Sequence, residues 1–269
     1  HGREGLERIA ERVHRLTSIC VAGFRQSNIE VTNTTWFDTI VIRVDSSREI
    51  HQRALKHNIL LRKIDDKSVG ISFDETSNLE TVKMLFDIFQ VDADISTLDQ
   101  SCVLGITQAM RRSDDFLTQS TFSKYRTEHE MLRYLRHLAD KDLALDRTMI
   151  PLGSCTMKLN SATEMEAVTW PEFSKLHPFA PTDQSVGSRE LIAQLSKWLV
   201  AITGYDAVSL QPNAGSQGEF AGLLAIRNYH DSRGDQARKI CLIPSSAHGT
   251  NAASAVMAGM NVVVIECDA

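Results

Sequence analysis

The stretch at residues 209–219, SLQPNAGSQGE, constrains the fold more than any other part of the chain. A short apolar run precedes it at 206–210, and an amphipathic pattern follows it at 220–229. This order predicts a strand, a tight glycine-bearing turn and a helix. Such a turn directs backbone N–H groups and the positive end of the helix at one point, which favours an anion, most often a phosphate. The alternative is a plain strand–helix turn.

The flanking sequence places this turn in an α/β sheet. Helical periodicity at 188–202 precedes it, and strand-like runs at 239–243 and 261–265 enclose a short helical pattern at 252–257. Alternating strands and helices with short turns predict right-handed crossovers and a mostly parallel sheet. Ligands of such sheets bind outside the carboxyl ends of the strands, which is where Gly215 would lie. The spacing matches neither a dinucleotide fingerprint nor a Walker loop.

A second turn, SAHGTN at residues 246–251, follows the next predicted strand. Its His248 could place an imidazole over a flat aromatic ligand or move protons, or it could serve only the turn. Gly249 would allow close approach of a ligand, and Thr250 is expected to cap the next helix.

A third candidate is the non-periodic run GSCTMKLN at residues 153–160. Lys158 could form a Schiff base with an aldehyde cofactor, but nothing local marks it as desolvated, so a solvated or anion-contacting lysine is the alternative. Cys155 has no histidine placed beside it by the sequence, which argues against a nucleophile.

The N-terminal part predicts a small α/β domain with a partly antiparallel sheet and no recognisable chemistry. Its expected elements are a helix at 2–26, a strand at 39–44, a helix at 48–57, strands at 60–64 and 69–73, and a helix at 79–89. We expect this domain to cover residues 1–95, a polar linker 96–127, and an incomplete large domain 128–269.

Composition excludes several classes of function. The formal net charge of −5 gives no reason to expect nucleic acid as a partner. No apolar stretch approaches the roughly 20 residues needed to span a bilayer. The five cysteines are widely spaced and never form a CxxC pair, so we expect neither a zinc site nor a disulfide framework.

Four motifs, in this order, make the pattern specific: PLGSCTMKLN, LHPFAP, QPNAGSQGE and SAHGTNAASA. Together they resemble the P-protein family of the glycine cleavage system. The members of this family are pyridoxal-phosphate-dependent glycine decarboxylases. Residues 1–110 resemble the end of that family's N-terminal half, and 116–269 the beginning of its catalytic half. The resemblance implies the type I pyridoxal-phosphate-dependent transferase-like fold, with the small domain followed by the first part of the large domain.

The resemblance also implies roles for individual residues. The cofactor phosphate would be held by Ala214, Gly215, Ser216 and Gln217, and Thr250 would border the cofactor. His248 would stack on the pyridine ring as a catalytic residue. The substrate pocket would be lined by Ser154, Cys155, Thr156, Lys158 and Asn251.

The activity implied by the resemblance is decarboxylation of glycine, with transfer of the aminomethyl group to the lipoyl arm of the H-protein. This is an oxidoreductase reaction on a CH–NH2 group with a disulfide acceptor. The implied partners are glycine, the lipoylated H-protein, the other proteins of the glycine cleavage system and a second copy in a homodimer. The implied location is mitochondrial.

Two motifs of the family are not matched in this sequence. These are the Schiff-base lysine, which follows a histidine near a glycine-rich stretch, and the acid that pairs with the pyridine nitrogen. We therefore expect the chain to be a piece of a longer protein and inactive alone. Another type I pyridoxal-phosphate enzyme, such as a cysteine desulfurase, is disfavoured by the PLGSCTMK loop. A non-catalytic scaffold or binding module on the same fold stays open.

Overall fold

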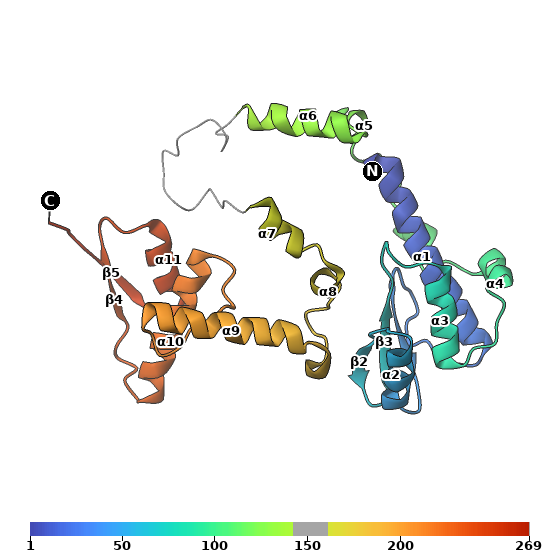
Figure 1. Cartoon of the computed structure of the whole chain (residues 1–269), viewed down its shortest axis with the longest axis horizontal. Coiled ribbons are helices and arrows are strands. Elements are labelled where there is room, and N and C mark those ends of the chain that lie inside the picture. The colour runs from blue at the N-terminus through green and yellow to red at the C-terminus, as the bar shows by residue number, and fades with distance from the viewer. Residues whose placement is uncertain (142–160, 269) are drawn as a thin grey trace. The chain divides into compact units, whose positions relative to one another are not determined.

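The computed structural model describes residues 1–141 and 161–268. The chain divides into two compact units, residues 1–160 and 161–269 (Figure 1). Both units are built from helices and strands, so the predicted mixed α/β class is confirmed. In the part of the chain that the structure describes, no helix has the length and apolar character to cross a membrane.

Unit 1 begins with the long helix α1 (Gly2–Gln26), which confirms the helix expected there. Apolar residues recur along one face at helical spacing, and this face is buried from Val13 to Phe24. The opposite face carries charges of both signs, including the Arg3–Glu7 pair at 3.0 Å. The helix therefore covers the core of unit 1 with one face and meets water with the other.

The sheet of unit 1 consists of β1 (Thr39–Arg43), β2 (Arg62–Asp65) and β3 (Ser68–Ser72), in the order β1-β3-β2. Both pairings are antiparallel, and β1 and β3 pair Ile40 with Ile71 and Ile42 with Val69. These four side chains are buried because alternate residues of a strand face the same side. Between β1 and β2 in the sequence lies α2 (Ser47–Lys56), whose N-cap is Ser46.

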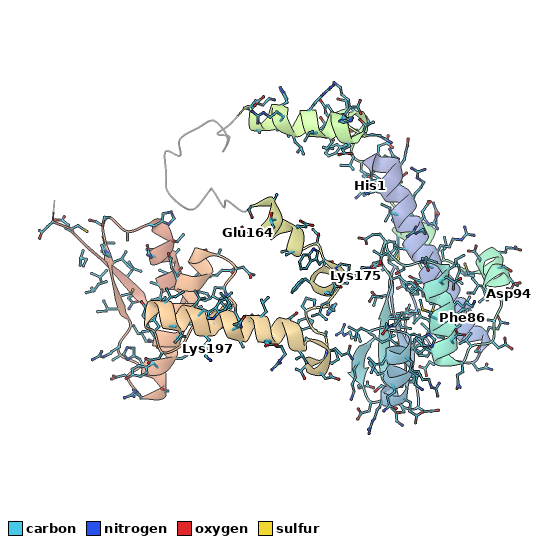
Figure 2. All side chains as sticks on the ribbon, in the orientation of Figure 1. His1, Phe86, Asp94, Glu164, Lys175 and Lys197 are labelled. Carbon is cyan, nitrogen blue, oxygen red and sulfur yellow. The ribbon has the colours of Figure 1, made fainter. Side chains whose placement is uncertain are left out.

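The core of unit 1 includes the contact between α1 and α3 (Leu79–Phe89). Phe24 of α1 makes edge-to-face contacts with Phe86 and Phe89 of α3, at centroid distances of 6.2 and 4.9 Å. Figure 2 labels Phe86 on α3. A methyl group at Gly23 would lie only 2.3 Å from the Phe86 ring, so the absence of a side chain there allows the two helices to approach closely.

The start of α3 is fixed by a reciprocal pair of hydrogen bonds. The Asn78 side chain accepts the Thr81 N–H at 3.0 Å, and the Thr81 hydroxyl oxygen accepts the Asn78 N–H at 3.2 Å. This arrangement is a capping box, and it confirms the helix start expected at residues 78–79.

Replacing Asn78 by Ala is therefore expected to lower the free energy of unfolding of unit 1 by about 1 kcal/mol, since one end of α3 loses its cap. Hydrogen exchange of the α3 amides measures this change. The control is Lys83→Ala on the exposed face of the same helix, with an expected change within about 0.5 kcal/mol. An equal effect of both substitutions would contradict the capping role.

After α3, the chain of unit 1 continues through short helices. These are α4 (Ile95–Ser101), the 3-10 turn η1 (Gln108–Met110), α5 (Thr121–Lys124) and α6 (Glu128–Ala139). Leu98 of α4 is buried in the core of unit 1, and Asp99 forms an ion pair with Arg15 of α1.

Unit 2 contains a two-stranded parallel sheet and several helices. Its elements are α7 (Ala162–Ala167), α8 (Pro171–Ser174), η2 (Thr182–Gln184), α9 (Val186–Thr203), α10 (Gly215–Ser232), β4 (Ile240–Pro244), α11 (Gly249–Met257) and β5 (Asn261–Ile265). Strands β4 and β5 pair in parallel, from Ile240 opposite Asn261 to Pro244 opposite Ile265. The predicted parallel β–α–β unit is therefore confirmed.

One predicted strand of unit 2 is wrong. Residues 206–210 do not form the expected strand; among the described residues, the sheet of unit 2 consists of β4 and β5, and residues 206–210 pair with neither. The segment 170–181 contains one helical turn, α8. Pro171 permits this turn because it occupies its first position, where an N–H would have no helical partner.

Candidate functional site

The predicted anion-binding turn is formed at the start of α10. The helix begins at Gly215, and the N–H of Gly218 donates to Ala214 O at 3.0 Å as the first helical hydrogen bond. The first N–H groups of a helix have no carbonyl one turn earlier to receive them. Ala214 is the N-cap, and its methyl side chain cannot accept a hydrogen bond. The N–H groups of residues 215–217 are thus available to an external anion.

The surroundings of this turn leave room for such an anion. A methyl group added at Gly215 would lie in open space, and residues 213–217 are exposed. The Oε1 of Gln217 accepts the Asn213 N–H at 2.9 Å, which orders the turn while leaving the Gln217 NH2 as a donor. The first turn of α10 contains no acidic residue. A phosphate there would meet donors and the positive helix end together.

The second predicted turn lies at the start of α11. The N-cap of this helix is His248, whose Nδ1 is 3.3 Å from the Thr250 N–H nitrogen and 2.9 Å from Thr250 Oγ1. The expectation that Thr250 caps the helix is therefore wrong, because Thr250 is already inside the first turn. Asn251 follows it and donates its N–H to His248 O at 3.0 Å. The imidazole of His248 is exposed at the start of α11.

The two turns are joined by Glu219, which lies one turn into α10. Thr250 Oγ1 is 3.2 Å from Glu219 Oε1, and Ser254 Oγ is 3.5 Å from Glu219 Oε2. Ser254 Oγ also lies 3.4 Å from Ser216 O. The structure thus brings the starts of α10 and α11 together. No role for Glu219 could be predicted from the sequence, although this residue closes the motif QPNAGSQGE.

The remaining predicted site residues are not placed. Ser154, Cys155, Thr156 and Lys158 lie outside the described residues. Their assignment to a substrate pocket stays a prediction from the resemblance.

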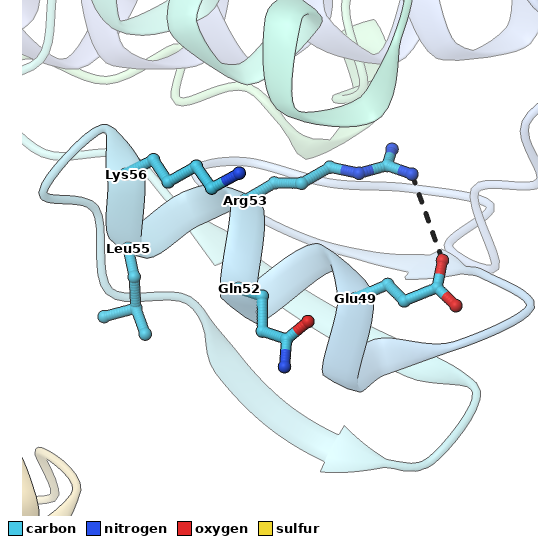
Figure 3. Close-up of a pocket in the computed structure, with 5 residues that line it drawn as sticks. All are labelled: Glu49, Gln52, Arg53, Leu55 and Lys56. Atoms are coloured by element: carbon cyan, nitrogen blue, oxygen red, sulfur yellow. Dashed lines mark ion pairs between the residues drawn. The ribbon is translucent and has the colours of Figure 1, made fainter.

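Two hollows among the described residues of unit 1 differ from this site. One, of about 480 Å³, lies on α2 and is lined by Glu49, Gln52, Arg53, Leu55 and Lys56. Figure 3 shows that all five side chains come from this one helix, with Glu49 and Arg53 paired at 3.9 Å. Such pairs on a solvated helix face are common and contribute little. We assign no chemistry to this hollow.

The other hollow, of about 1030 Å³, lies between α1 and residues 99–116. Its lining mixes apolar and charged side chains, and it includes the buried His14. The Nδ1 of His14 donates to Phe37 O at 2.9 Å, and the two rings stack with centroids 5.4 Å apart. His14 is thus held as a packed residue, in keeping with the absence of recognisable chemistry in its sequence surroundings.

Comparison with known proteins agrees with the motifs. Residues 1–89 match the family model described as glycine cleavage system P-protein. The whole chain is similar to three bacterial proteins named glycine dehydrogenase (decarboxylating). It is 53% identical to that of Serratia proteamaculans, 56% to that of Cupriavidus metallidurans and 55% to that of Xanthomonas euvesicatoria. The resemblance to the P-protein is thereby confirmed.

The same comparison bears on the length of the chain relative to these proteins and on the expected location. The chain spans 29%, 28% and 28% of the length of these relatives, respectively. The expected mitochondrial location is not supported, because these relatives come from bacteria.

Proposed function

We propose that the chain is a segment of a pyridoxal-phosphate-dependent glycine decarboxylase, because all of its 269 residues align with P-protein relatives. The joined starts of α10 and α11 form the part of the active site that holds the cofactor. One observation supports this proposal above the others: the uncapped start of α10 lies beside the exposed His248, linked to it through Glu219 and Thr250.

The described residues fit the cofactor. Its phosphate is an anion, and the N–H groups of residues 215–217 with the Gln217 NH2 and the Ser216 hydroxyl supply donors around one point. The exposed ring of His248 is available to stack on a flat pyridine ring. Ala214 and Thr250 border this space. When bound, the cofactor supplies the electron sink that lets the carboxylate of glycine leave as CO2.

The wider assignments follow the resemblance. Ser154, Cys155, Thr156, Lys158 and Asn251 would line the pocket for glycine. The aminomethyl group would pass to the lipoyl arm of the H-protein, in company with the other proteins of the glycine cleavage system, and the parent enzyme would be a homodimer. The fold would be the type I pyridoxal-phosphate-dependent one. Residues 1–95 would form the small domain, 96–127 the linker and 128–269 the first part of the large domain.

This assignment predicts that the chain does not hold the cofactor covalently. Its lysines do not match the family's Schiff-base motif. After treatment with pyridoxal phosphate and borohydride, mass spectrometry is expected to find no lysine with a stoichiometric reduced adduct. The control is the full-length glycine dehydrogenase of Serratia proteamaculans, where one labelled lysine is expected. Stoichiometric labelling of Lys158 in this chain would contradict the prediction.

A further inference from the structure

We propose that Glu219 is a positioning residue that selects the tautomer of His248. The inference rests on the proposed function, in which His248 stacks on the cofactor ring. Glu219 itself does not touch the cofactor in this proposal; it acts through Thr250.

Three groups form a continuous hydrogen-bonded row. The Glu219 Oε1 lies 3.2 Å from Thr250 Oγ1, which lies 2.9 Å from His248 Nδ1. Glu219 and Thr250 are half-buried where α10 packs on α11, whereas the ring of His248 is exposed. The row therefore runs from a partly shielded carboxylate to a solvent-facing imidazole.

The direction of the protons in this row follows from the donor inventory. An ionised carboxylate can only accept hydrogen bonds, so Thr250 must donate its single hydroxyl proton to Glu219. The Thr250 oxygen can then only accept from His248, which requires a proton on Nδ1. The neutral ring consequently carries its lone pair on Nε2. Glu219 thus determines which ring nitrogen is protonated, although it does not contact the ring.

One competing contact favours the other tautomer. The backbone N–H of Thr250 lies 3.3 Å from His248 Nδ1 and could donate to this nitrogen only if it carries no proton. This contact is longer than the 2.9 Å contact with the Thr250 hydroxyl oxygen. Without Glu219, both the hydroxyl and the backbone N–H of Thr250 can donate to Nδ1. The proton of the neutral ring would then move to Nε2.

Ser254 lies next to the other oxygen of the carboxylate. Its side chain is buried, and its Oγ lies 3.5 Å from Glu219 Oε2 and 3.4 Å from Ser216 O. A hydroxyl has one proton and donates it to one of these acceptors at a time. Ser254 therefore competes only for Oε2 of Glu219, and Oε1 remains the acceptor for Thr250.

The test reads the tautomer of His248 directly, in the 269-residue chain without cofactor. Two-bond proton–nitrogen correlation spectra separate protonated from unprotonated ring nitrogens at a pH where the ring is neutral. We expect Nδ1 to be the protonated nitrogen in the wild-type chain. Glu219→Met removes both accepting oxygens at similar side-chain length. The Nδ1 signal should then move to the chemical shift of an unprotonated ring nitrogen. Thr250→Val, which interrupts the row, should have the same effect.

The matched control is Glu219→Gln, whose amide oxygen can still accept from Thr250 and should keep the proton on Nδ1. Amide spectra of α11 and β5 check that each variant remains folded. An unchanged tautomer in folded Glu219→Met, or an equal shift in Glu219→Gln, would overturn the proposal. The experiment requires no bound cofactor. A failure of the wild-type chain to bind pyridoxal phosphate would therefore refute the proposed function separately from this result.

Discussion

Replacing Phe24 by Ala is expected to lower the free energy of unfolding of unit 1 by about 3–5 kcal/mol. Phe24 is fully buried, and its ring lies against Phe86 and Phe89 of α3. Truncation removes the ring from the centre of the α1–α3 contact and leaves a cavity, because neighbouring side chains collapse only in part. The loss is a large fraction of the stability of a typical domain.

The measurement is a urea titration that follows the indole N–H resonance of Trp36. This residue belongs to the core of unit 1, and its indole donates to Ser18 Oγ at 3.0 Å. The control is Phe122→Ala, which truncates a phenylalanine that is 45% exposed. This substitution should lower the free energy of unfolding by clearly less than Phe24→Ala. Equal midpoints for wild type and Phe24→Ala would contradict the packing described for α1 and α3.

Replacing Gly215 by Asp is expected to weaken the binding of pyridoxal phosphate by about 10–100-fold. The carboxylate would occupy the start of α10, repel the phosphate and compete for the N–H groups of residues 215–217. Hydrogen bonds to charged groups contribute roughly 1.5–3 kcal/mol, and about 1.4 kcal/mol corresponds to a factor of ten. The fold should tolerate the change, since an acidic residue is favourable at a helix start and the site is open.

The matched control is Gly222→Asp, on the same helix and likewise in open space. It adds the same charge about two turns further along, roughly 10 Å away, where screening by salt is strong. Its affinity for pyridoxal phosphate should stay close to that of the wild type. Titrations followed by the amide resonances of α10 give both dissociation constants. If both substitutions weakened the binding of pyridoxal phosphate equally, the added net charge alone would explain the effect. That result would contradict a phosphate site at Gly215.

Unit 1 could be predicted from its sequence because its signals are local. Apolar residues at helical spacing define α1, alternating apolar residues define β1 and β3, and Asn78 with Thr81 starts α3 through a capping box. Each signal is contained within a few neighbouring residues. The two strands also find their partners, because β1 and β3 pair with each other. The boundaries differ by at most one or two residues from those expected.

The errors in unit 2 arise where structure depends on distant partners. Residues 206–210 have the composition of a strand, but a strand also needs a hydrogen-bonded neighbour. The helix cap at His248 was missed because histidine is an uncommon N-cap, whereas Thr250 has the usual composition. Glu219 was missed for a related reason: its contacts are with Thr250 and Ser254, more than thirty residues later.

The central claim is that the starts of α10 and α11 hold the phosphate and ring of pyridoxal phosphate. The most direct measurement is an amide chemical-shift titration of the wild-type chain with pyridoxal phosphate, compared with pyridoxal, which lacks the phosphate. The account predicts that pyridoxal phosphate shifts the amides of residues 214–217 and 248–251, and that pyridoxal shifts those of 214–217 far less. It would be contradicted by equal shifts with both compounds, or by shifts confined to the hollow between α1 and residues 99–116.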